Sequence, residues 1–226
     1  MTDTIGPSPE MYLKTLHELS VSDRPVSISA VADRMGVSPV SASEMIHRLE
    51  ERRLVRHRRY HGVTLTRSGR EHAKSLIRRH RLWECFLHEE LGLPWQAVHD
   101  LACELEHAAP DEVTEALNRR LQSPAKCPHG NPIPSDAAPE RPTEAPGTPL
   151  ADLSQGDLGA FLSIHPETSE DLEYLARHGF LPGTEFRLER IEVADQLRVL
   201  RHAGGTIVIG PSLTARLRVR GTATRR

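Results

Sequence analysis

The spacing of apolar residues predicts three amphipathic helices near the start of the chain, because these residues recur at helical intervals. Ser27 precedes the second helical segment and Ser38 the third, and a serine there accepts hydrogen bonds from the free N–H groups of the first turn. Pro39 fits the first turn of the third helix, where no backbone donor is needed. The expected helices cover residues 9–19, 28–35 and 40–52.

Two short β-prone segments follow the third helix and predict a β-hairpin. They cover residues 54–58 and 62–66, on either side of Arg59-Tyr60-His61. Three helices followed by a hairpin are typical of a winged helix-turn-helix, which places its third helix in the major groove of DNA. We therefore predict a winged helix-turn-helix DNA-binding domain over residues 1–66.

The remainder of the chain divides into a helical part, a linker and a β-rich part. Helical spacing predicts an all-helical domain over residues 67–122, and the abundance of proline predicts an extended linker over residues 123–150. Residues 151–226 predict a small β-barrel, so the expected fold is mainly α with small β parts. The expected helices cover residues 66–91, 95–107 and 111–121, and the expected strands cover residues 185–192, 197–201, 206–209 and 213–219.

The composition of the whole chain restricts its location more than its partners. A formal net charge of −2 favours no particular class of partner. Three cysteines and a polar N-terminus without a signal peptide predict a protein of the reducing cytoplasm. No segment approaches the roughly 20 consecutive apolar residues of a membrane span, so no membrane partner is expected.

Positive charge is concentrated between residues 48 and 81, where twelve basic residues stand against three acidic ones. An isolated segment of this kind is more often a solvated basic face than a binding site. This one coincides with the end of the expected recognition helix and with the wing, so we interpret it as a surface for DNA phosphates, including Arg48, Arg58 and Arg59. The residues expected to read base edges are Ser38, Pro39, Ser41, Ser43 and Glu44.

Potential metal ligands share one face of the helix expected over residues 95–107. Cys103, Glu106 and His107 stand at positions i, i+3 and i+4, and His99 lies one turn before Cys103. A thiol, a carboxylate and imidazoles together suit a first-row transition metal better than Ca²⁺ or Mg²⁺. A zinc-protease motif is excluded, because Cys103 stands where His-x-x-Glu-His requires the first histidine.

Other residues of the same types allow ordinary structural interpretations beside the metal-binding one. His80 and Glu84 form an i, i+4 pair on the preceding helix, and a single pair of this kind is usually a solvated surface feature. Met11 by itself is most simply a core methionine. Cys127 and His129 offer only two ligands, so we interpret Cys-Pro-His-Gly as a structural turn.

Four motifs are spread along the chain, and as a set they resemble those of the diphtheria toxin repressor family of iron- or manganese-dependent repressors. The resemblance covers nearly the whole chain. It implies a winged helix, a helical dimerisation and metal-binding domain, a Pro-rich linker and an SH3-like (FeoA-like) barrel, in a homodimer that binds a pseudo-palindromic double-stranded DNA operator. The motifs are Glu10-Met11-Tyr12-Leu13-Lys14, His80-Arg81-Leu82-Trp83-Glu84, Val98-His99-Asp100-x-Ala-Cys103-x-x-Glu106-His107 and Gly130-Asn131-Pro132-Ile133-Pro134.

The resemblance also implies two metal sites per subunit for Fe²⁺ or Mn²⁺, with other divalent transition metals able to substitute in vitro. Carried over by position, the primary site comprises Met11, Cys103, Glu106 and His107, and the ancillary site comprises His80, Glu84 and His99. Longer family members add two ligands from the barrel, and these positions fall on Ser163 and Pro166. That part of the pattern is missing, and the neighbouring residues able to substitute are His165, Glu167 and Asp171.

The sequence therefore predicts a metal-activated DNA-binding repressor that controls iron or manganese homeostasis genes. The alternative is a metal-independent winged-helix regulator that senses a small organic ligand. A metalloenzyme is the third interpretation, but the chain has no Ser-His-Asp order, phosphate loop or intact zincin motif, so we do not expect an enzyme.

Overall fold

The computed structural model describes residues 6–20, 24–135, 147–192, 194 and 196–222. The chain divides into two compact units, Met1–Arg79 and His80–Arg226, and each is described separately. No helix in the described part of the chain is both long and apolar enough to cross a lipid bilayer.

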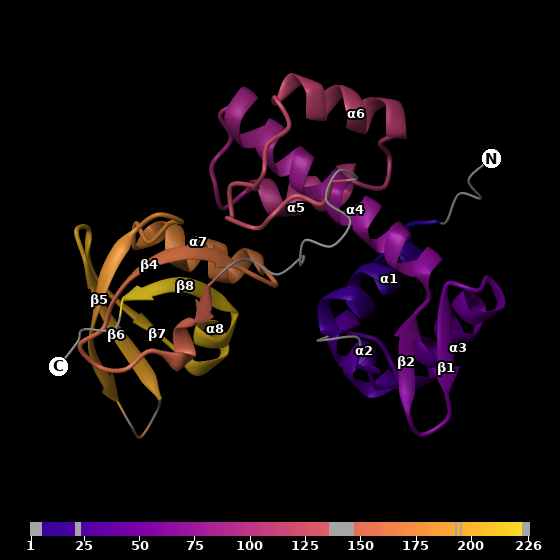
Figure 1. Ribbon diagram of the computed structural model, residues 1–226, viewed down its shortest axis with the longest axis horizontal. Helices are drawn as coiled ribbons and strands as arrows, with labels where there is room; N and C mark the ends of the chain where they lie inside the picture. The colour runs from indigo at the N-terminus through magenta and orange to yellow at the C-terminus, as the bar shows by residue number, and fades with distance from the viewer. Residues whose placement is uncertain (1–5, 21–23, 136–146, 193, 195, 223–226) are drawn as a thin grey trace. The chain divides into compact units, whose positions relative to one another are not determined.

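The first unit has the predicted winged helix-turn-helix architecture. Ser27 and Ser38 cap their helices as expected, accepting hydrogen bonds from the N–H groups of Ala30 and Ser41 at 3.1 Å. Figure 1 shows the β1–β2 hairpin beside α3, where the two strands pair antiparallel. The elements are α1 (Pro7–Leu19), α2 (Ile28–Met35), α3 (Pro39–Glu51), β1 (Val55–Arg58), β2 (Gly62–Leu65) and the first part of α4 (Arg67–Cys85).

The core of the first unit forms because each helix has one apolar face. On α3 the buried residues are Ala42, Ile46 and Leu49, which recur at helical spacing and leave the opposite face of the helix exposed. They join apolar residues of α1, α2 and both strands in one cluster, within which Leu13 and Val31 are almost fully buried. This core holds α3 and the wing together.

The helical part of the second unit follows the predicted order, with shorter helices. A π-helical turn, Phe86–Glu90, continues α4, and α5 (Val98–Leu105) and α6 (Asp111–Arg120) follow. The helix expected from residue 95 begins at Val98, and Trp95 instead packs with the apolar core of the β-rich part. Trp95 Nε1 donates a hydrogen bond to Pro128 O at 2.8 Å.

The C-terminal part is a six-stranded antiparallel sheet in the order β3-β8-β4-β5-β6-β7, curled into a small barrel (Figure 1). Its core includes Phe161, Phe180 and Leu200, all fully buried. Residues 136–146 of the expected linker lie outside the described residues. The elements are β3 (Thr148–Pro149), β4 (Leu158–Ile164), α7 (Ser169–Arg177), β5 (Glu185–Glu192), β6 (Leu197–His202), β7 (Gly205–Ile209), α8 (Pro211–Arg216) and β8 (Leu217–Thr222), with a 3-10 turn at Leu150–Asp152.

One predicted strand is wrong, and several elements of the C-terminal part were not predicted. The segment 213–219 contains α8 and only the start of β8, because Pro211 occupies the first turn of a short helix after the extended Gly210. Leu213 and Leu217 are both buried at i, i+4 spacing, a pattern that a short apolar cluster shares with a strand. The elements β3, β4 and α7 and the 3-10 turn at Leu150–Asp152 were not predicted.

Candidate metal centre and nucleic-acid interface

The N-terminal half of α3 presents the predicted base-reading residues to solvent. Ser38, Pro39, Ser41 and Glu44 are exposed, and Ser43 is half-buried. Ser38 Oγ also lies 2.9 Å from Ser41 Oγ, so the two hydroxyl groups are held together at the start of the helix. The small and polar face is therefore available for contact.

Val40 belongs to the same surface, although the sequence pattern assigned it to no site. Its side chain is 69% exposed, and among the described large apolar and aromatic residues only Tyr60 is more exposed. An exposed apolar group at the start of a recognition helix fits contact with the methyl group of thymine. The available signal was its position off the buried stripe formed by Ala42 and Ile46.

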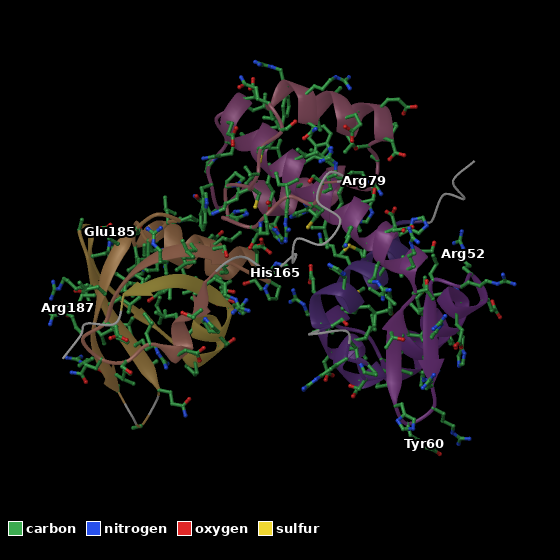
Figure 2. All side chains as sticks on the ribbon, viewed as in Figure 1. Arg52, Tyr60, Arg79, His165, Glu185 and Arg187 are labelled. Atoms are coloured by element: carbon green, nitrogen blue, oxygen red, sulfur yellow. The ribbon has the colours of Figure 1, made fainter. Side chains whose placement is uncertain are left out.

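The wing carries basic residues next to an exposed aromatic ring. Arg58 and Arg59 are exposed, as is Arg48 on α3. Tyr60 is 88% exposed at the tip of the hairpin, where Figure 2 shows its side chain pointing outward. The guanidinium carbon of Arg59 lies 5.0 Å from the centre of the Tyr60 ring. These groups form a cationic tip suited to a nucleic-acid backbone.

Glu84 is fully buried and lies at the centre of a cluster of histidines in the second unit. Its Oε1 atom is 2.9 Å from Nε2 of His80, 3.0 Å from Nδ1 of His129 and 3.4 Å from Nδ1 of His99. The helix α4 places His80 and Glu84 one turn apart, and α5 contributes His99. The histidines therefore converge on one carboxylate from separate segments of the chain.

The second oxygen of Glu84, Oε2, is buried and has no hydrogen-bond partner among the described residues. Burial by itself raises the pKa of Glu84, but the charges of His129 and His80 and their hydrogen bonds outweigh burial and hold the pKa well below its ordinary value. A buried carboxylate oxygen without a partner destabilises the fold unless a cation or donor completes it. The cluster therefore fits a divalent metal ion.

Cys103 joins this cluster from α5. Its Sγ atom lies 4.0 Å from Nδ1 of His80 and 3.9 Å from Nε2 of His99, and the ligand atoms of all three residues lie within 4.8 Å of one another. Burial by itself lowers the pKa of His99, but hydrogen bonds with Cys103 and Glu84 outweigh burial and raise the pKa to about 10. His80 Nδ1 also lies 2.7 Å from Oε2 of Glu106. Residues expected in two separate sites are thus contiguous here.

The remaining residues of the expected primary site lie on both units of the chain. Glu106 is fully buried, and its Oε1 atom lies 3.5 Å from Nε2 of His107. The helix α5 ends at Leu105, but Glu106 keeps helical backbone angles (φ −60°, ψ −30°), so the one-turn spacing from Cys103 continues past the helix end. Met11 is half-buried on α1, in the first unit.

Cys127 and His129, interpreted from the sequence as a structural turn, also lie beside the Glu84 cluster. The turn exists, since Gly130 N–H donates to Cys127 O at 2.8 Å. Both side chains are buried beside Glu84, and the ligand atoms of these three residues lie within 4.8 Å of one another. Burial raises the pKa of the Cys127 thiol well above its ordinary value, and the Glu84 charge raises it further. The sequence did not identify this group, because its third member, Glu84, lies more than 40 residues before Cys127 in the chain.

Of the barrel residues considered as metal ligands, Glu167 is the one whose charge interacts with His99 and Glu84 of the buried cluster. Its side chain is 7% exposed, and it accepts hydrogen bonds from Asn131 and from His165 Nδ1, the latter at 3.2 Å. Its charge acts on His99 and contributes to the raised pKa there. Asp171 instead pairs with Arg216, with Oδ2 and Nη1 2.6 Å apart.

Ser163 and Pro166 occupy the two barrel positions at which the resemblance implies metal ligands, and neither has a side chain that commonly binds a metal ion. Ser163 is fully buried, and its hydroxyl oxygen has no partner among the described residues. Pro166 has no side-chain donor atom, and its carbonyl oxygen accepts a hydrogen bond from Arg216 at 3.2 Å. A barrel carboxylate is instead offered by the neighbouring residue Glu167.

Three family descriptions match successive parts of the chain. Residues 4–63 match "Iron dependent repressor, N-terminal DNA binding domain", and residues 66–135 match "Iron dependent repressor, metal binding and dimerisation domain". Residues 148–221 match the FeoA domain. The matched order is the order predicted from the sequence.

Named relatives and solved structures agree with these matches. The diphtheria toxin repressor of Corynebacterium glutamicum is 30% identical over 219 residues, covering 93% of this chain and 94% of that protein. IdeR of Mycobacterium tuberculosis is 35% identical over 156 residues, covering 63% of this chain and 68% of that protein. The chain spans about half the length of the Corynebacterium jeikeium repressor, at 38% identity over 125 residues (55% of this chain and 52% of that protein).

Among solved structures, a manganese-dependent transcriptional repressor in complex with manganese has a TM-score of 0.78 and 35% identity, and the match covers 95% of this chain and all of that chain. ScaR with bound Cd²⁺ has a TM-score of 0.81 and 29% identity, covering 94% and 98%. These matches extend over all three parts of the fold. The chain therefore belongs to the family of iron- and manganese-dependent transcriptional repressors that includes the diphtheria toxin repressors and IdeR.

Proposed function

We propose that this chain is a repressor whose affinity for DNA rises when it binds Fe²⁺ or Mn²⁺, and that it controls iron or manganese homeostasis genes. The observation that carries this proposal is the Glu84 cluster, in which imidazoles and thiols surround a buried carboxylate whose second oxygen has no partner among the described residues. The same chain presents an exposed recognition helix and a basic wing. A metal sensor and a DNA reader are thereby combined in one polypeptide.

The proposed ancillary site comprises His80, Glu84 and His99, with Glu167 as its barrel ligand. The side chains of Cys127 and His129 lie beside Glu84 and extend the set of available ligands. The support for Glu167 is its buried carboxylate and its electrostatic interaction with His99, whereas the Asp171 carboxylate is occupied by Arg216. His165 acts by donating a hydrogen bond to Glu167.

The proposed primary site comprises Met11, Cys103, Glu106 and His107. A metal held by these residues ties α1 of the first unit to α5 of the second and favours one relative orientation of the two units. The thioether and thiol favour Fe²⁺, while the carboxylates and imidazoles of both sites also suit Mn²⁺. Metal and DNA then strengthen each other's binding by the same factor.

The proposed partner is a pseudo-palindromic operator bound by a homodimer in the cytoplasm. Two-fold symmetry places two recognition helices in successive major grooves, about 34 Å apart. The proposed domains are the DNA-binding domain at residues 1–66, the helical dimerisation and metal-binding domain at 67–122, the linker at 123–150 and the barrel at 151–226. A strictly monomeric metal-loaded protein on DNA would contradict this arrangement.

The test is a binding titration with duplexes selected by the metal-loaded protein. Fe²⁺ under anaerobic conditions, or Mn²⁺, is expected to raise the DNA affinity of the wild-type chain about 5- to 150-fold. A His107→Ala variant is expected to lose most of this increase, and His178→Ala, a matched substitution at the C-terminal cap of α7, to keep it. Equal affinity of the wild type with and without either metal would favour the metal-independent regulator instead.

A further inference from the structure

A second group of metal-ligating side chains lies in the DNA-binding unit, apart from the buried cluster described above. It comprises His47 and Glu50 on α3 and His57 on β1. One ligand atom from each residue lies within 4.8 Å of the other two. His47 is exposed, while Glu50 and His57 are half-buried, so the group is reachable from solvent.

The local sequence brings these three residues together in a simple way. Residues 47 and 50 are three apart on a helix, which places their side chains on one face. Along β1 the burial alternates from buried Val55 through exposed Arg56 to half-buried His57, so His57 lies on the same side of the strand as the core-facing Val55. The helix α3 and the strand β1 pack against each other in the first unit.

Two contacts hold the group in place without a metal ion. The backbone N–H of His57 donates a hydrogen bond to Glu50 Oε1 at 2.8 Å, which orients the carboxylate. The imidazole rings of His47 and His57 meet edge to face, with centroids 5.8 Å apart and an interplanar angle of 75°. Little rearrangement is needed for both imidazoles and the carboxylate to point at one ion.

The charges closest to this group attract a cation, whereas the arginines around it repel one. Glu50 supplies a negative charge and lies in the last turn of α3, where the helix dipole is negative, and His47 lies just before that turn. The neighbouring side chains of Arg48 and Arg56 are exposed and positive, and solvent screens much of their repulsion. We therefore expect weaker binding here than at the buried cluster.

We propose that His47, Glu50 and His57 bind a divalent transition-metal ion of the Zn²⁺ type. Two imidazoles and one carboxylate are ligands that Zn²⁺ and its neighbours in the first row accept, and three protein ligands leave a coordination position for water. Residue 47 lies one turn after Ser43 and Glu44 on the same face of α3, so the ion adds positive charge beside the base-reading surface.

The test counts Zn²⁺ bound per chain by equilibrium dialysis of the full-length protein. The wild type is expected to hold one more Zn²⁺ per chain than either His57→Ala or Glu50→Gln. The matched control is His61→Ala, which removes an exposed histidine from the same hairpin and is expected to bind as the wild type does. Thermal melts of the metal-free proteins confirm that each variant is folded. Equal stoichiometry in all four proteins would overturn the proposal.

A second measurement separates this site from the proposed regulatory sites. In a full-length His107→Ala chain, paramagnetic Co²⁺ is expected to shift or broaden the imidazole resonances of His47 and His57 and to leave that of His61 less affected. Co²⁺ signals confined to histidines of the second unit would overturn the proposal. Either result is independent of whether metal raises the affinity for DNA.

Discussion

At the scale of single residues, the decisive feature is the buried carboxylate of Glu84, which has hydrogen-bond partners for only one of its two oxygens among the described residues. Glu84 accepts from three imidazoles through one oxygen and leaves the other oxygen without a partner among the described residues. The pKa of Glu84 is lowered, whereas the pKa of His129 is raised because the Glu84 charge outweighs the opposing effect of burial. Protons and metal ions therefore compete for the same nitrogen atoms.

This competition predicts how metal binding depends on pH. Since the pKa of His99 is raised to about 10, its imidazole is protonated in the metal-free protein at neutral pH and must lose a proton to bind a metal. Metal affinity is expected to increase from pH 6 to pH 8, with protons released on binding. Calorimetry in buffers of different ionisation enthalpy measures this release, and His99→Gln is expected to reduce it. Binding without proton release would contradict the assignment.

The same shifts set the pH dependence of the metal-free fold, and the two signs oppose each other. A lowered pKa at Glu84 means that its contribution to stability is present above its ordinary pKa and is lost as the pH falls through its lower value in the fold. A raised pKa at His99 means that its contribution is present below its ordinary pKa and is lost as the pH rises toward about 10. Both contributions are fully present only between the ordinary pKa of a glutamate and the ordinary pKa of a histidine, and the cluster stabilises the metal-free protein most in that pH range.

At the scale of elements, α3 combines a buried face that fixes its position with an exposed face that is free to vary. Ala42, Ile46 and Leu49 are buried, whereas Val40 and Glu44 are exposed. Substitutions on the exposed face therefore affect recognition more than stability. The base-reading residues can differ from those of relatives without disturbing the winged helix.

Glu44 provides a direct test of this separation. A carboxylate accepts a hydrogen bond from the amino group of cytosine, whereas a glutamine side chain pairs with adenine. Glu44→Gln is expected to shift the preferred base at one position of each half-site from cytosine to adenine, with discrimination of about 1–3 kcal/mol. Selection of duplexes from a random pool measures the preference. Glu51→Gln, an exposed substitution at the end of α3, is expected to leave it unchanged.

At the scale of the whole molecule, segments distant in sequence meet within the second unit. Asn131 donates hydrogen bonds to Ile164 O and to Glu167, and His129 accepts a backbone hydrogen bond from Ile164 through its carbonyl oxygen. These bonds join the segment after α6 to the barrel beside the buried cluster. They are consistent with the proposal that a barrel residue contributes to metal binding.

Replacing Glu167 tests whether the barrel supplies a ligand. Glu167→Gln keeps the shape of the side chain and removes its charge, and it is expected to lower the affinity of the ancillary site for Mn²⁺ by about 10- to 100-fold. Titration calorimetry on the full chain measures the change. Glu170→Gln is the matched control, because Glu170 is exposed at the start of α7. A loss of affinity with Asp171→Asn but not with Glu167→Gln would reverse the assignment.

Local sequence determined the winged helix and the order of helical and β-rich parts, because helical spacing, caps such as Ser27 and Ser38 and the alternation in a hairpin are short-range properties. It also identified the i, i+4 pair of His80 and Glu84. Only the tertiary structure decided that Cys127 and His129 lie beside Glu84. It also decided that the charge of Glu167 acts on His99, whereas Asp171 pairs with Arg216. These groups come from segments far apart along the chain, and no local periodicity reports such a meeting. For the same reason, the apolar residues of 213–219 did not distinguish a short helix from a strand.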